Sequence, residues 1–81
     1  MKMERNELVK MINSALAEEF EIEESVITPS GSIKDTLELD SLSLVDLIAL
    51  MEQKTGVKIP GSDVTKILTF DALYDYIAER M

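Results

Sequence analysis

The residues of this chain that could take part in chemistry centre on one short stretch, Asp40-Ser41-Leu42. Asp and Ser are preferred at helix starts, and an apolar helical segment follows them, so Asp40 is expected to cap a helix whose first residue is Ser41. A hydroxyl at that position is exposed and lies beside unpaired backbone N–H groups and the positive end of the helix dipole. Such a position suits a phosphate ester, so Ser41 is a candidate for modification by another enzyme.

Catalysis by the chain itself lacks the usual groups. There is no His to act as a general base and no Cys to act as a nucleophile, so a hydrolytic serine would have no partner. The acidic residues do not follow the spacing of an EF-hand calcium loop, and the three glycines form no phosphate-binding loop. We therefore expect neither an enzyme nor a metal site.

The composition restricts the partners. The 81 residues include 16 acidic and 8 basic ones, which gives a formal net charge of −8. This charge repels nucleic acid and anionic lipid, so proteins with basic surfaces are the expected partners. Residues 42–51 are the longest nearly uncharged apolar stretch, about half of what a membrane helix needs, and no signal peptide is recognised. We expect a single domain over residues 1–81, monomeric and cytoplasmic, with no membrane contact.

Residues 4–19 and 70–81 have the spacing of amphipathic helices, because their apolar side chains recur every three or four positions. Thr69 is the expected cap of the second of these helices. Residues 21–40 show no clear period and contain a cluster of Pro, Gly, Ser and Thr, which predicts a long loop. Scattered apolar side chains are expected to hold this loop to the core: Val26, Ile27, Ile33, Leu37 and Leu39.

A helix that begins at Ser41 and ends at Thr55 is expected to be apolar on two faces, with Gly56 following its last turn. The face expected to fill the core consists of Leu44, Leu47, Ile48 and Met51. The opposite face consists of Leu42, Val45 and Ala49, with Asp46 beside them and Leu50 at the boundary. This second face is either covered by another part of the protein or exposed as a docking surface.

The remaining residues predict a connector and one short helix. Residues 57–61 are expected to be extended, and Ser62 and Asp63 to cap a short helix over residues 64–68, with an irregular loop as the alternative. No segment alternates with the period of a strand. The fold class is therefore all-α: a small bundle of three main helices plus one short helix, with a long loop between the first two main helices.

The spacing downstream of Ser41 resembles that of the discrete acyl carrier proteins. An acid, Asp46, follows Ser41 after five residues, and Ile59-Pro60 follows it after about eighteen. The length, the negative charge and the order of helices are also similar, so the resemblance covers nearly the whole chain. It implies that a phosphopantetheinyl transferase attaches 4′-phosphopantetheine from coenzyme A to Ser41, where the terminal thiol holds acyl chains as thioesters for fatty-acid or related biosynthesis.

The resemblance also implies roles for the surrounding residues. The partners are the transferase and the acyl-transferring and chain-extending enzymes, which have basic docking surfaces. The residues implied to contact these partners are Asp40, Leu42, Val45, Asp46 and Ala49. The residues implied to line a cavity for the acyl chain are Leu44, Leu47, Ile48, Met51, Ile59 and Ile67.

The chain departs from the family pattern at several positions. Glu38 stands where the family usually has Gly, three residues before the Ser, so a loop of different shape is expected there. Ser43 stands where the fatty-acid members have an acid, and Lys54 and Lys58 make the far end of the helix less acidic. These departures favour a specialised carrier over a housekeeping one. The alternatives are a peptidyl, polyketide or D-alanyl carrier, or a noncatalytic helical interaction module without the prosthetic group.

Overall fold

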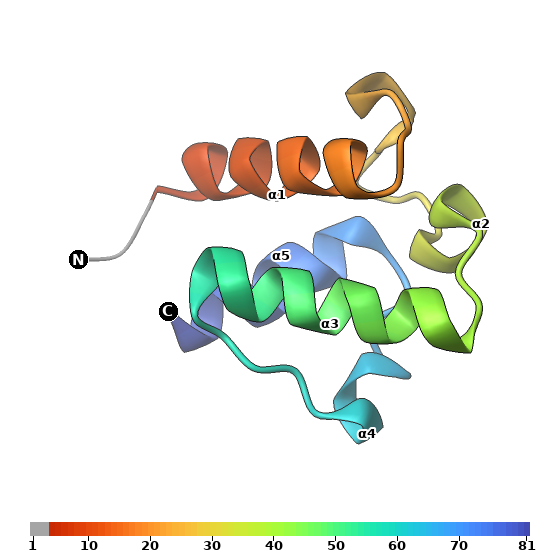
Figure 1. Cartoon of the computed structure of the whole chain (residues 1–81). Helices are drawn as coiled ribbons and strands as arrows, with labels where there is room; N and C mark the ends of the chain where they lie inside the picture. The colour runs from red at the N-terminus through yellow and green to blue at the C-terminus, as the bar shows by residue number, and fades with distance from the viewer. Residues whose placement is uncertain (1–3) are drawn as a thin grey trace.

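The computed structural model describes residues 4–81 and consists of helices joined by loops (Figure 1). Its elements in chain order are α1 (Arg5–Glu19), the 3₁₀ turn η1 (Glu24–Val26), α2 (Ile33–Leu37), α3 (Ser41–Thr55), α4 (Gly61–Val64) and α5 (Phe70–Arg80). Over these residues the extended pairing is limited to one antiparallel bridge between Ser32 and Thr69. The expected all-α class is confirmed. No helix within 4–81 is both long enough and apolar enough to cross a membrane.

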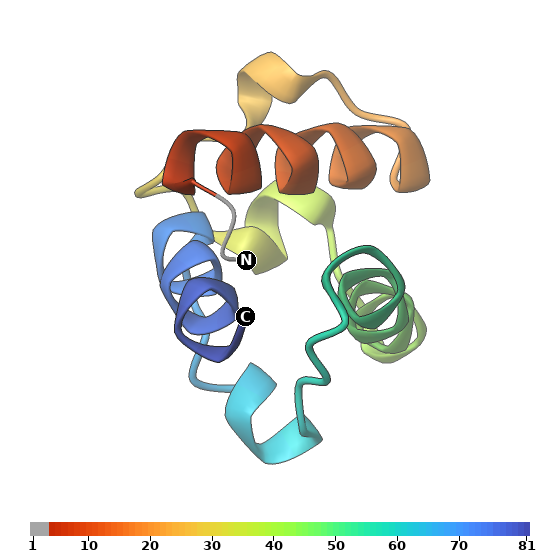
Figure 2. The same cartoon turned by 90° about the vertical axis from the view of Figure 1, so that its left-hand side faces the viewer.

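The three long helices enclose the core from three sides. Figure 2 shows α3 and α5 nearly end-on and beside each other, with α1 lying across them and α4 on the opposite side. The short helix α2 lies between α1 and the start of α3 in both views (Figures 1 and 2). The long connection from α1 to α3 allows α1 to cross the other two helices obliquely, which a short turn would not.

Each long helix contributes an apolar stripe to this core. The buried residues of the three long helices are Leu8, Ile12, Ala15, Leu16, Leu47, Leu50, Met51, Phe70, Leu73, Tyr74 and Ile77. Leu50 was expected at the boundary of the α3 stripe but is buried, because α1 packs against α3 on that side. At the other side of α1, Arg5 forms ion pairs of 2.8 Å with Asp71 and 2.7 Å with Asp75 on α5.

The segment expected to be a long loop contains the helix α2, which the sequence interpretation missed. Five residues are too few for a helical period to show in a sequence. The local reason for the helix is the Ser32 side chain, which accepts a hydrogen bond from the Asp35 N–H at 3.3 Å. Ile27, Ile33 and Leu37 are buried as expected, and Leu39 packs partly against the core. Val26 is exposed, so the prediction that it holds the loop to the core was wrong.

The short helix α4 begins and ends earlier than the predicted 64–68. It starts at Gly61, directly after Pro60, whose extended backbone sets the direction of the chain into the first turn. Ser62 and Asp63 therefore lie inside α4 instead of capping a later helix. The Asp63 carboxylate accepts a hydrogen bond from the Tyr76 hydroxyl of α5 at 2.7 Å, so it is engaged in joining two helices.

Candidate functional site

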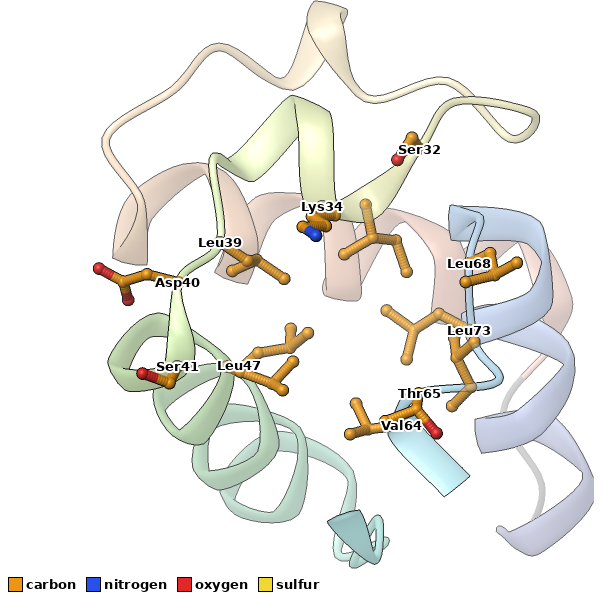
Figure 3. A pocket seen from close by; sticks show the side chains of 13 residues that line it. Ser32, Lys34, Leu39, Asp40, Ser41, Leu47, Val64, Thr65, Leu68 and Leu73 are labelled. Carbon is orange, nitrogen blue, oxygen red and sulfur yellow. The ribbon is translucent and has the colours of Figure 1, made fainter. Parts of the chain in front are cut away.

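The start of α3 is built by its capping residue. The Asp40 carboxylate accepts a hydrogen bond from the Ser43 N–H at 2.8 Å, as the sequence predicted. This backbone hydrogen bond lowers the pKa of Asp40, because it favours the charged carboxylate. Ser41 is the first residue of the helix and is exposed. Figure 3 shows the Ser41 hydroxyl and the Asp40 carboxylate at one edge of a pocket and directed away from it.

The chain enters this cap through Glu38, which adopts the left-handed conformation with φ 51° and ψ 50°. We expected Glu in place of Gly to change the shape of this loop, but Glu38 takes the conformation that Gly favours. Its N–H and that of Leu39 both donate to the carbonyl oxygen of Lys34, the latter at 3.0 Å. These hydrogen bonds end α2 and direct residues 39 and 40 toward α3.

A pocket of about 520 Å³ lies next to Ser41, bounded by α2, the start of α3, the end of α4 and α5. Of the six residues expected to line an acyl cavity, Leu44, Leu47 and Ile67 line this pocket. The other three do not: Met51 and Ile59 are buried in the packed core, and Ile48 is half-buried outside the lining. The hollow therefore extends from α3 toward α2 and α5 and does not follow α3 toward its C-terminal end.

Several lining residues were not predicted. They are Ser32, Ile33, Lys34, Leu39, Val64, Thr65, Leu68 and Leu73, together with Asp40 and Ser41 at the edge. Ile33 and Leu39 could have been suspected from the sequence, because they are apolar residues in a segment without a helical period. Leu73 gave no such signal, since its place on the apolar face of α5 predicts only that it is buried. The pocket is thus formed by side chains from four separate segments (Figure 3).

The second apolar face of α3 is open to solvent. Leu42 is 78% exposed and Val45 is 62% exposed, and Ala49, one turn further, is also exposed. Asp40 and Asp46 are exposed next to this face. The face therefore combines apolar and acidic groups along the first turns of α3, starting beside Ser41. We call these five residues the α3 face.

The chain is similar to known proteins over most of its length. The family model described as "Phosphopantetheine attachment site" matches residues 10–77. The chain is 38% identical over 78 residues to the acyl carrier protein of Rubrobacter xylanophilus, covering 96% of both chains. It is 34% identical over 77 residues to that of Thermotoga maritima, covering 95% of both. It is 38% identical over 77 residues to the meromycolate extension acyl carrier protein of Mycobacterium tuberculosis, covering 95% of this chain and 67% of that one.

A solved structure is also similar over nearly the whole chain. The acyl carrier protein from Enterococcus faecalis superimposes with a TM-score of 0.79 at 32% identity. The match covers 98% of this chain and 100% of that one. The helical arrangement described above is therefore shared with this solved structure.

Proposed function

The chain belongs to the acyl carrier protein family, and we propose that Ser41 is the residue to which its 4′-phosphopantetheine is attached. Members of this family carry acyl groups on covalently bound phosphopantetheine and are carriers, not catalysts. They work with a phosphopantetheinyl transferase and with biosynthetic enzymes. The observation that carries the assignment to Ser41 is its position: an exposed hydroxyl at the first residue of α3, directly after the Asp40 cap and beside a largely apolar pocket.

The surroundings of Ser41 fit the group and leave the chemistry to a partner. Attachment forms a bond between the Ser41 oxygen and the phosphorus of coenzyme A that bears pantetheine, while the nucleotide half of coenzyme A departs. The hydroxyl proton has to be accepted by the transferase, because this chain has no His and Asp40 is engaged with the Ser43 N–H. Once attached, the group supplies the thiol that the cysteine-free chain lacks.

The pocket beside Ser41 is the proposed site of the acyl chain. Its aliphatic walls provide the apolar surroundings that an acyl chain prefers to water, and Leu44, Leu47 and Ile67 belong to them. We include Ile48, Met51 and Ile59 as a second layer. Met51 and Ile59 are fully enclosed, so a longer chain would reach this layer only by opening the packing behind the pocket.

The α3 face is the proposed docking surface for partner enzymes. Leu42, Val45 and Ala49 offer apolar contact, while Asp40 and Asp46 attract basic side chains of the partner. A carrier that serves several enzymes needs this face free, so we propose that the protein acts as a monomer. We propose the cytoplasm as its location, where coenzyme A and the transferase are at hand.

The attachment site is tested by mass. The protein is incubated with coenzyme A and a broad-specificity phosphopantetheinyl transferase and then weighed. We expect a gain of one phosphopantetheine group in the wild type, none in Ser41→Ala, and a full gain in Ser43→Ala, which changes another hydroxyl of the same helix turn. A gain in Ser41→Ala, or no gain in the wild type, would overturn the assignment.

The docking surface is tested by the rate of the same reaction. Leu42→Asp places a charge in the apolar part of the α3 face and should slow attachment strongly. Val26→Asp is the control, because Val26 is also an exposed apolar residue, at 48%, but lies in η1, outside both α3 and the pocket lining. Equal rates for the two variants would contradict a role for the α3 face.

A further inference from the structure

Lys34 is an unusual residue to find in the lining of the pocket. The walls are mainly aliphatic, and the charged residues among them are Asp40 and Lys34. Asp40 is engaged in capping α3, with its carboxylate on the Ser43 N–H. Lys34 is exposed, and within residues 4–81 its ammonium forms no hydrogen bond or ion pair. The other lysines within residues 4–81 also form no ion pair, so what distinguishes Lys34 is its place in the lining of the pocket that Ser41 borders.

The backbone holds Lys34 in a fixed place. The neighbouring Ile33 and the Leu37 of the same short helix are buried, which attaches α2 to the core. The carbonyl oxygen of Lys34 accepts the two hydrogen bonds that end α2. The flexible side chain therefore starts from a backbone position that is held in place, and Figure 3 shows its nitrogen in front of α2, at the rim of the pocket.

Attachment at Ser41 changes the charge balance at this edge. A phosphodiester adds a negative charge next to the Asp40 carboxylate, and like charges repel. Lys34 is the cation that lines the same pocket. An attraction between this cation and the new anion would draw the arm toward the pocket, whereas the α3 face with Asp40 and Asp46 would repel it.

From this juxtaposition, and resting on the proposed attachment at Ser41, we infer that Lys34 is a positioning residue for the phosphodiester of the arm. The Ser41 hydroxyl is directed away from the pocket, so the arm has to turn back over the edge. By pairing with the anion there, Lys34 favours the arrangement in which the acyl chain lies inside the pocket over the one in which it extends into solvent. The same ammonium would also attract a carboxylate at the far end of a cargo, so the test separates these two anions.

The simpler role for Lys34 is that its aliphatic stem covers part of the apolar surface. Lys34→Met removes the charge and keeps a stem of similar length, so a covering role predicts no change in this variant. Lys58→Met is the matched control, because it removes the same charge from an exposed lysine that does not line the pocket. Lys34→Gln serves as a second variant in case Lys34→Met does not fold, which its melting temperature reveals.

The experiment loads each protein with an octanoyl-phosphopantetheine arm and measures how fast neutral hydroxylamine cleaves the thioester at low salt. Mass spectrometry first establishes that all variants are loaded at Ser41, and a failure there counts against the proposed function and not against Lys34. In Lys34→Met we expect cleavage about two- to fivefold faster than in the wild type and in Lys58→Met, the range given by a partly exposed ion pair. The difference should disappear at about 1 M salt, where charges are screened within about 3 Å.

A second cargo identifies the anion. The measurement is repeated with an eight-carbon chain that ends in a carboxylate. An equal effect of Lys34→Met on both cargoes supports pairing with the phosphodiester, and so does a shift of the ³¹P resonance between the wild-type and Lys34→Met holo-proteins without cargo. An effect confined to the carboxylate-ended cargo would overturn the inference in favour of cargo recognition. Equal cleavage rates in all variants would overturn the inference altogether. So would an effect of Lys58→Met as large as that of Lys34→Met.

Discussion

The molecule has two regions that are packed in different ways. The scaffold region consists of α1, α5 and the second half of α3, and it includes side chains with no exposed surface, such as Ile12, Leu16, Phe70 and Ile77. The pocket region consists of α2, the start of α3, α4 and the segment before α5, and it surrounds a hollow of about 520 Å³. Close packing is the usual state of protein interiors, so the side chains that line this hollow make fewer contacts with one another than those of the scaffold region.

The difference follows from the lengths of the elements. Helices of eleven to fifteen residues carry a full apolar stripe and can bury it against two neighbours. Helices of four and five residues offer one or two buried side chains each, so they close the side of the core without filling it. We conclude that the scaffold region supplies the stability that allows the pocket region to enclose open space.

The largest expected contrast between the regions comes from two positions that are only two residues apart in sequence. Phe70→Ala removes a fully buried ring from the scaffold region and should lower the free energy of unfolding by about 3–5 kcal/mol. Leu68→Ala, at the exposed edge of the pocket, should change it by about 0.5 kcal/mol or less. Urea denaturation measures both, and comparable losses would show that the pocket edge is as tightly packed as the core.

Helix caps give a second, smaller contrast. The Thr69 hydroxyl accepts the Ala72 N–H at 3.2 Å and caps α5, so Thr69→Ala should lower the free energy of unfolding by about 1 kcal/mol. Ser32 caps α2 in the same manner, but Ser32→Ala should cost less, because α2 has only five residues. Denaturation of the two variants under one condition tests this. An equal loss would mean that α2 is as much a part of the cooperative fold as α5.

Two glutamates in the left-handed backbone conformation allow the two regions to be compared by substitutions that should stabilise the protein. Glu38 before the site and Glu21 after α1 have φ values of 51° and 54°, which glycine adopts without a steric cost. Glu38→Gly and Glu21→Gly should each raise the free energy of unfolding by about 0.5–1 kcal/mol. Glu24→Gly, in η1, has no such conformation to relieve and should destabilise. A loss of stability in Glu38→Gly would show that the Glu38 side chain makes contacts that matter at the site.

The smallest expected effect concerns the charge of the Asp40 cap. Asp40→Asn keeps a capping oxygen but cannot ionise. Because the folded pKa of Asp40 lies below its ordinary value of 3.8, its charge stabilises the fold at pH values above 3.8, and this contribution is lost as the pH falls through the folded pKa. The wild type should therefore be slightly more stable than Asp40→Asn at pH 7, and the difference should vanish in strong acid. Thermal unfolding across this pH range measures it, and a constant difference would contradict the role of the charge.

The long elements could be predicted from the sequence because their information is local. The segments 4–19 and 70–81 were found to within one residue, and so was the helix that begins at Ser41. The position of Leu42, Val45 and Ala49 opposite the core stripe followed from the helical period, but that they are exposed and not covered by another part of the protein came from the structure. The helix α2 and the start of α4 were not found. A segment of four or five residues shows no helical period, and a single residue at its start is too weak a signal to predict a helix.

By itself, the sequence determined the all-α class, the negative charge and the place of Ser41 behind a capping Asp40, since each depends on residues that are close together along the chain. Only the tertiary structure decided where the pocket lies, that Lys34 lines it, and that Met51 and Ile59 do not. The physical reason is that a pocket is the space left between elements that are distant in sequence. Its lining depends on how α2, α3, α4 and α5 pack against each other, which no local pattern of residues records.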